Sequence, residues 1–310
     1  MTATYSTMSD DMNRIFLWCV PRTVSTALVK CLSFVEGLQV VNEPYECAFH
    51  SGPERKNPNP DLNNPVEKRL MGLLDITGCD EDIGGYEASV CTYRYVRDEL
   101  LKASYGDSKI LFCKDMAFYL DAKYHMLPKG FKYSFLIRHP AKVFLSWKNS
   151  LKQTFGESCA KQMDDLTTIP ATVFPVGFGF KELYELLMYV EVDLHQEAVI
   201  LDIDDLLADP PGLLSAYCLK MGIPYQPGLL TWDAGGEVSE NWVVSKSLKV
   251  ANKRAGFYGK ALQSSGFQSP KPPPALDSLP ADVQTCVEAS MGYYDKLRAK
   301  RIRPLSAKML

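Results

Sequence analysis

The chain has few of the residues from which metal centres and hydrolytic triads are built. It has four histidines among 310 residues, with no H-x-x-x-H or G-x-S-x-G arrangement. Its nine cysteines are odd in number and include no C-x-x-C pair. We therefore expect neither a metal site nor a disulfide framework. Free cysteines inside apolar segments favour a reducing, cytoplasmic compartment.

An excess of basic residues and an N-terminal apolar run are also missing. The formal net charge is −3, so broad electrostatic capture of nucleic acid is not expected. Residues 1–13 are polar and acidic and do not resemble a signal peptide or membrane anchor. We expect no stable membrane association, and a homodimer is possible. The basic stretch 296–308 is expected to be a solvated helix end.

Apolar runs alternate with helical patterns along the chain. Strands are expected near 14–20, 38–42, 109–114, 132–138 and 198–203, and helices near 25–36, 65–75, 87–105, 140–152, 180–197, 210–221 and 281–299. Such alternation predicts an α/β fold with a parallel sheet covered by helices on both faces. The expected parts are a flexible N-terminus (1–13), an α/β domain (14–265), a proline-rich linker (266–280) and a C-terminal helix with a basic tail (281–310).

The first motif lies where the first strand meets the first helix. The apolar run Ile15 to Val20 is followed by P-R-T-V-S-T, and helical sequence continues from Ala27. Backbone N–H groups at a helix N-terminus and the helix dipole attract anions. Hydroxyl groups of Ser25 and Thr26 and the guanidinium of Arg22 would add donors. The loop is therefore predicted to bind phosphate or sulfate, although a plain strand-turn-helix with a Ser/Thr cap would look similar.

A second motif of this kind follows the fourth strand. The run Y-S-F-L-I ends in Arg138-His139-Pro140, and Ser146 lies two turns along the next helix. An arginine and a hydroxyl at the carboxyl edge of a parallel sheet would suit a second phosphate. Arg138 alone could be a surface ion-pair partner, but two such motifs on one α/β chain favour anion binding.

The pair P-R-T-x-S-T and I-R-H-P-x(5)-S resembles the sulfotransferase superfamily, which has a fold similar to that of P-loop NTPases. The resemblance covers roughly residues 14 to 225. It implies 3'-phosphoadenosine 5'-phosphosulfate (PAPS) as co-substrate, without a metal. It also implies a cradle for the 5'-phosphosulfate, formed by Arg22, Thr23, Val24, Ser25 and Thr26. A separate site for the 3'-phosphate would be formed by Arg138 and Ser146.

Two further segments look like parts of that family. I-L-F-C-K-D resembles the central strand with its terminal lysine, Lys114. The late K-x-G-x-x-G loop is matched only loosely, by Lys253, Arg254 and Gly256. The resemblance implies a phosphate role for that loop. The chain departs from the family at His139, where R-D-P is usual.

Sulfuryl transfer requires aligned acceptor and leaving oxygens, neutralised charge on the leaving group and a general base. The resemblance suggests Arg22 and Lys114 for charge neutralisation. The histidine that cytosolic members often use is replaced by Met116. Other branches use a glutamate after the second strand, which here is Glu43. We predict Glu43 as the base, with Asp115, Glu46 and His50 as alternatives.

The acceptor is expected to be a small molecule with a hydroxyl or amine nucleophile. The loop expected at 43–64 and the segment 153–176 would shape its pocket, although their aromatic residues could equally belong to the core. Two other functions are compatible with the sequence. One is a metabolite or nucleotide kinase with a divergent phosphate loop, against which the missing G-K-[ST] argues. The other is a non-catalytic nucleotide-binding protein.

Overall fold

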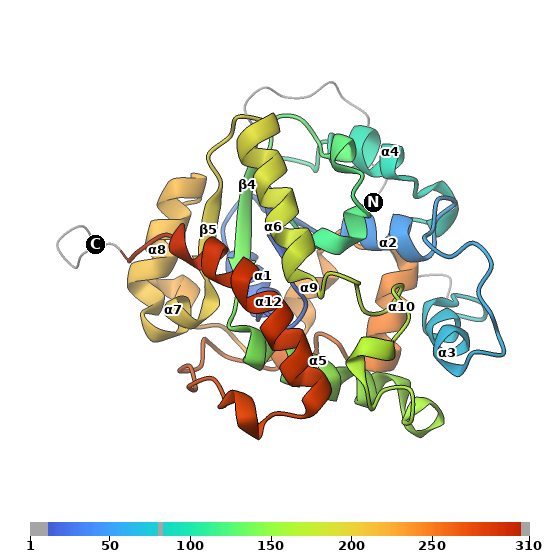
Figure 1. Ribbon diagram of the computed structural model, residues 1–310. Coiled ribbons are helices and arrows are strands. Elements are labelled where there is room, and N and C mark those ends of the chain that lie inside the picture. The colour runs from blue at the N-terminus through green and yellow to red at the C-terminus, as the bar shows by residue number, and fades with distance from the viewer. Residues whose placement is uncertain (1–11, 80–82, 305–310) are drawn as a thin grey trace.

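A single parallel β-sheet forms the centre of the protein. The computed structural model describes residues 12–79 and 83–304 (Figure 1). Five strands lie in the order β2-β3-β1-β4-β5. Their bounds are β1 Asn13–Cys19, β2 Leu38–Asn42, β3 Ile110–Met116, β4 Lys132–Ile137 and β5 Val199–Asp202. The sheet confirms the predicted α/β class and all five predicted strands.

The strands are parallel because helices connect them and cover both faces. Their side chains are almost all buried, as expected for a parallel sheet shielded on both sides. The register places Leu17 of β1 and Asn42 of β2 on either side of Lys114 of β3. The carboxyl ends of β1, β2, β3 and β4 therefore meet at one edge of the sheet. This is where ligands of such sheets bind.

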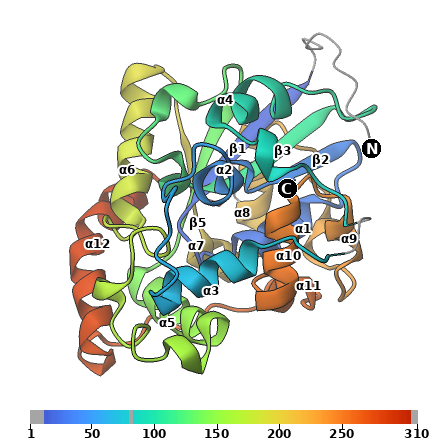
Figure 2. The same cartoon turned by 90° about the vertical axis from the view of Figure 1, so that its right-hand side faces the viewer.

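Helices form layers on both sides of this sheet. Figure 2 shows α6 and α12 on one side, and α1, α10 and α11 on the other. The helices are α1 Ser25–Leu32, α2 Pro44–His50, α3 Pro65–Leu74, α4 Tyr93–Tyr95, α5 Pro140–Phe155, α6 Phe180–Met188, α7 Ile203–Ala208, α8 Pro210–Met221, α9 Glu237–Glu240, α10 Lys246–Ala255, α11 Gly259–Leu262 and α12 Ala281–Ala299.

Several features differ from the sequence-based expectation, and the short helices α7, α9 and α11 were not predicted either. Residues 44–50 form helix α2, although a loop was expected from 43 to 64. Pro44 occupies the first helical turn, where its missing N–H costs no hydrogen bond. The predicted helix 87–105 is broken into short turns. Helix α10 was not predicted at all, because its sequence has many charges and no long apolar stripe.

The predicted domain boundaries remain a prediction. Most of the segment 1–13 lies outside the described residues. Residues 268–275 have no regular secondary structure.

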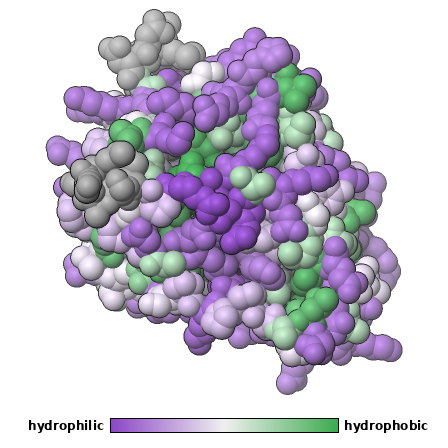
Figure 3. Space-filling view, turned by 60° about the vertical axis from the view of Figure 1, so that its left-hand side comes forward, coloured by the Kyte–Doolittle hydropathy of each residue, from purple (hydrophilic) through white to green (hydrophobic). Residues whose placement is uncertain are grey.

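The face shown in Figure 3 is mostly hydrophilic, with hydrophobic residues in separate groups. Within residues 12–79 and 83–304, no helix is long and apolar enough to cross a membrane.

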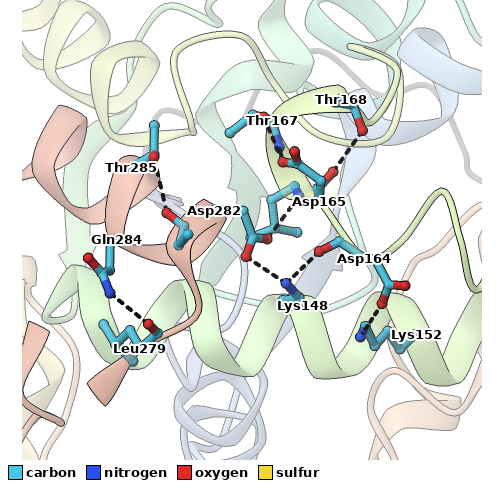
Figure 4. Close-up of polar contacts among 12 residues, drawn as sticks. Lys148, Lys152, Asp164, Asp165, Thr167, Thr168, Leu279, Asp282, Gln284 and Thr285 are labelled. Carbon is cyan, nitrogen blue, oxygen red and sulfur yellow. Dashed lines mark hydrogen bonds and ion pairs between the residues drawn. The ribbon is translucent and has the colours of Figure 1, made fainter. Parts of the chain in front are cut away.

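Buried polar contacts join α5 to the start of α12 (Figure 4). The Lys148 ammonium donates to the Asp282 carboxylate at 2.6 Å and to the Asp164 carbonyl at 2.7 Å. Asp282 also accepts the Leu166 N–H at 3.0 Å. The side chains of Lys148 and Asp282 are 9% and 8% exposed, so this ion pair is largely shielded from water. It fixes the segment after α5 against both helices.

The variant Asp282→Ala is expected to lower the free energy of unfolding by about 3–5 kcal/mol, because it leaves the Lys148 ammonium buried without a counter-charge. Asp164→Ala is the matched control. The Asp164 carboxylate is 67% exposed and pairs only with Lys152, which is 43% exposed. Removing it should cost less than about 1 kcal/mol. Urea unfolding of both variants measures the difference, and equal losses would contradict this account.

Candidate active site

A cavity of about 1040 Å³ opens at the carboxyl edge of the sheet. Residues that directly follow strands β1, β2 and β4 line it, together with the end of β3. Most of the residues predicted from the two anion motifs are among them. The cavity is lined by Arg22, Val24, Ser25, Thr26, Glu43, Lys114, Arg138 and Ser146.

The structure joins the two predicted phosphate motifs into one site. Nε of Arg22 donates to Oγ of Ser146 at 3.2 Å. Nη1 of Arg138 donates to the Arg22 carbonyl at 3.0 Å. The first loop and the start of α5 are therefore in direct contact, although 124 residues separate Arg22 from Ser146. Ser25 and Thr26 begin α1, whose first N–H groups have no partner within the helix.

The two guanidinium groups lie in an unfavourable environment without an anion. Burial and the charge of Arg138 lower the pKa of Arg22. Burial also lowers the pKa of Arg138, against the effect of Asp204. Nε of Arg138 is buried and has no hydrogen-bond partner among the described residues, although Oδ1 of Asp204 lies 3.9 Å away and pairs with its charge. An anion between these groups would relieve the repulsion and satisfy this donor.

Thr23 differs from its neighbours in the loop. Its hydroxyl donates to the Val20 carbonyl at 2.8 Å, and its side chain is fully buried. The Thr23 side chain therefore holds the loop together and does not line the cavity. The sequence alone does not show whether a loop hydroxyl donates to a backbone carbonyl of the same loop or faces the cavity.

Three non-glycine residues around the cavity have left-handed backbones. The φ angles are 68° at Arg22, 62° at Val24 and 54° at Glu43. Such conformations cost on the order of 1–3 kcal/mol each and persist only where the surrounding structure enforces them. At Glu43 the following Pro44 disfavours the α conformation. The turn places the Glu43 side chain next to Lys114.

Glu43 and Lys114 form a buried ion pair at the centre of the site. Nζ of Lys114 donates to Oε1 of Glu43, and the side chains are 1% and 7% exposed. Burial disfavours the Lys114 charge, but Glu43, Cys19 and Asp115 together outweigh this effect, and the pKa of Lys114 is raised. Both side chains also line the cavity. They can therefore act together on a bound molecule.

The alternative bases have different surroundings. Asp115 is fully buried behind the site, where its carboxylate accepts the N–H groups of Tyr45 at 2.6 Å and Met116 at 2.7 Å. It anchors the start of α2 and does not line the cavity. His50 lies beside Phe49 and Tyr119, and burial lowers its pKa to about 4. It is therefore a weak base.

Glu46 lies in the first turn of α2, three residues after Glu43, and lines the cavity. It is 3% exposed, and its Oε2 has no hydrogen-bond partner among the described residues. Burial, with smaller effects from Cys47, Glu43 and Asp115, raises the pKa of Glu46 well above its ordinary value. Glu46 thus favours the protonated, uncharged form.

His139 takes the place of an acidic residue at the start of α5. Its Nδ1 accepts the Ala141 N–H at 3.3 Å, so the imidazole caps the helix. Burial lowers the pKa of His139, which favours the neutral ring that this cap requires. The substitution in the second motif therefore preserves the helix start that positions Arg138.

The predicted loop 253–256 does not reach the cavity. Lys253 and Arg254 are exposed, and neither they nor Gly256 line it. The Arg254 guanidinium instead binds carbonyl groups at the end of α3, at 2.7 Å for Gly72 and 2.6 Å for Asp75. Because Gly256 ends α10, the chain turns there and the following residues face the cavity instead.

Sequence reasoning missed several cations and one wall of the cavity. Lys142, Lys260 and Lys271 line it, as do residues 266–274, which were predicted only as part of a linker. Lys30 of α1 holds the start of this segment, because its buried ammonium donates to the carbonyls of Leu262 and Ser264. A proline-rich composition indicates an extended chain but not the surface against which it packs.

Comparisons with known proteins support part of this picture. The family described as Sulfotransferase domain matches residues 190–301. This match confirms the resemblance to sulfotransferases for that part of the chain. The motifs around Arg22 and Arg138 lie outside the matched residues.

Curated relatives and solved structures are distant. Branched-chain-amino-acid aminotransferase-like proteins 2 and 1 of Arabidopsis thaliana are 22% and 23% identical over 93% and 92% of this chain. The chain spans about two fifths of their length, 42% and 41%. Among solved structures, a sulfotransferase domain from the curacin biosynthetic pathway is 15% identical over 90% of this chain and 98% of its own, with a TM-score of 0.42. A sulfotransferase from Alicyclobacillus acidocaldarius is 15% identical over 83% of this chain and 98% of its own, with a TM-score of 0.45.

The variant Glu46→Gln is expected to stabilise the protein at neutral pH more than at acidic pH. A raised pKa means that the folded chain keeps a proton that the unfolded chain releases above about pH 4. Rising pH therefore favours unfolding of the wild type, and glutamine removes this effect. Urea unfolding at pH 4 and pH 7.5 measures it, with the exposed Glu288→Gln as control. An equal gain at both pH values would contradict the raised pKa.

Proposed function

We propose that this protein transfers a sulfuryl group from PAPS to a small-molecule acceptor. The observation that carries the proposal is the contact between the two anion motifs. Cationic and hydroxyl donors of Arg22, Arg138 and Ser146 lie together in the cavity. The paired side chains of Lys114 and Glu43 line the same cavity. PAPS offers two anionic groups, joined by a nucleoside, to such a site.

The residues present fit this co-substrate. Ser25, Thr26 and the start of α1 would hold the 5'-phosphosulfate, as anions bind at helix N-termini. Arg138 and Ser146 would hold the 3'-phosphate, and the buried Nε of Arg138, which faces Asp204 at 3.9 Å without a hydrogen bond, could donate to such a group. Arg22 lies between both groups, because it contacts Ser146 and belongs to the first loop.

In the proposed transfer, PAPS would supply the sulfuryl group when bound. Glu43 accepts the proton of the acceptor as the acceptor oxygen or nitrogen forms its bond to sulfur. Lys114 and Arg22 compensate the negative charge that develops on the leaving phosphate as the bond between its oxygen and sulfur breaks. The hydrogen bond from Lys114 orients the Glu43 carboxylate.

The first test is calorimetric binding of 3'-phosphoadenosine 5'-phosphate (PAP), AMP and ATP without Mg²⁺. PAP is expected to bind more tightly than AMP or ATP. Arg138→Ala should weaken PAP binding about 10- to 100-fold, which corresponds to the loss of charge-assisted hydrogen bonds. Arg94→Ala, at an exposed position on α4, is the control and should change nothing. No preference for the 3'-phosphate, or a requirement for Mg²⁺, would contradict the proposal and favour a kinase.

The variant Glu43→Gln is expected to preserve PAP affinity and to lower turnover about 10²- to 10⁴-fold, as for the loss of a general base. The amide keeps an oxygen that can accept from Lys114, and unchanged PAP affinity shows that the site still folds. Glu46→Gln is the matched comparison from the same helix and should retain activity. Loss of turnover in Glu46→Gln with retention in Glu43→Gln would identify Glu46 as the base.

A further inference from the structure

We propose that the acceptor is an uncharged alcohol with a hydrocarbon body, and that this body lies between α3, α5 and α10. The proposal rests on the proposed function for the position of the reacting hydroxyl beside Glu43. It commits to one of the acceptor types that the sequence left open. Two observations support it: the walls of the cavity formed by α3 and α10 carry no charged side chains, and the charged side chains of these helices bind other groups instead.

Eight arginine, lysine and glutamate residues line the cavity: Arg22, Glu43, Glu46, Lys114, Arg138, Lys142, Lys260 and Lys271. They come from the strand ends, the two anion motifs, α2, α5, α11 and the 266–274 segment. None of the lining residues from α3 or α10 is charged. The cavity therefore has an anion-binding end and an apolar end, with Glu43 and Lys114 at the strand ends.

Helix α3 presents only leucines to the cavity, through Leu70, Leu73 and Leu74. Its charged residues are used elsewhere. The Glu67 carboxylate accepts from the Asn57 side chain at 3.0 Å and from the Asp61 N–H at 2.6 Å. The Arg69 guanidinium donates to the Thr154 carbonyl at 3.2 Å. These contacts hold the leucine face of α3 towards the cavity.

Helix α10 closes this end of the cavity. Leu248 and Ala251 line it, whereas Lys246 pairs with Glu87 and Arg254 binds the carbonyl groups at the end of α3. Ala251 packs with Leu73 and Leu74 in a small hydrophobic cluster of their own. Two short helices that are highly charged in sequence thus contribute an uncharged wall.

Helix α5 connects the apolar end to the anion site. Ser146 contacts Arg22, and the next residue, Trp147, lines the cavity together with Leu151 and Phe155. These three side chains are 3–6% exposed. The polar lining residues Asn149 and Gln153 of the same helix are exposed. The buried part of this wall therefore suits a hydrocarbon and offers few partners for a sugar.

The reacting end favours an alcohol over an amine. An amine of ordinary basicity would arrive protonated beside the guanidinium of Arg22, and the charges of Glu43 and Lys114 already balance each other. Burial raises the pKa of Glu46, which favours its uncharged form, so Glu46 adds little negative charge to attract an ammonium group. A neutral hydroxyl meets no such repulsion, and Glu43 can take its proton during transfer.

Binding of linear alcohols from 1-butanol to 1-octanol, measured by saturation-transfer NMR without nucleotide, tests the proposal. Affinity should rise about four-fold for each methylene group that enters the apolar wall. Glucose should bind no better than 1-butanol, and 1-hexylamine should bind less tightly than 1-hexanol. Affinity that does not change with chain length, or tighter binding of glucose, would overturn the proposal.

Variants locate the site. Leu70→Asn places an amide in the apolar wall at a partly buried position and should reduce the affinity for 1-octanol at least ten-fold. Leu62→Asn is the control, since Leu62 is 60% exposed and does not line the cavity. Melting temperatures check that both variants fold; Leu70→Asn is expected to melt somewhat below wild type, because Leu70 packs on the cluster of Leu73, Leu74 and Ala251. An unchanged 1-octanol affinity in Leu70→Asn would show that the alcohol binds elsewhere and would overturn the proposal.

Failure of the acceptor proposal can be distinguished from failure of the proposed sulfuryl transfer. PAP affinity should be the same in wild type and Leu70→Asn, because Leu70 lies outside the anion end. If PAP binds and glucose but not 1-octanol is sulfated, the acceptor assignment fails and sulfuryl transfer stands. If alcohols bind with the expected dependence on chain length but PAP does not bind, the proposed function fails instead.

Discussion

The buried ion pair between Lys114 and Glu43 is the interaction on which the rest of the site depends. Two charges with almost no exposure are tolerated only when each compensates the other. The pair joins the end of β3 to the turn after β2 and so determines where α2 begins. It also fixes the position of Glu46. The backbone strain at Glu43 is maintained by this pair and by the anchoring of α2 to Asp115.

The anion end of the cavity is built on a different balance. Arg22 and Arg138 are held together by hydrogen bonds of the loop and of α5, although their charges repel. An anion bound between them, as proposed above, would offset this repulsion. The capping of α5 by His139 and the packing of α12 against α5 keep this arrangement in place.

At the apolar end, the composition of a helix does not indicate which of its faces lines the cavity. Helices α3 and α10 contain many charged residues, yet each turns an uncharged face to the cavity. This happens because carbonyl groups and carboxylates at the periphery bind the charged side chains. The family match at 190–301 includes α10 and the 266–274 segment, but not the residues of α1, α2 and α5 that line the cavity.

The sequence by itself determined the α/β class, the five strands and the residues of both anion motifs. Strong apolar periodicity and residues that directly follow strands are local signals, and the carboxyl ends of parallel strands must share an edge. Only the tertiary structure decided that Arg22 contacts Ser146, that the Thr23 side chain turns inward and that Arg254 binds α3. It alone also placed α3, α10 and the 266–274 segment around the cavity. These contacts join segments far apart in the chain, and their geometry depends on packing that no local pattern encodes.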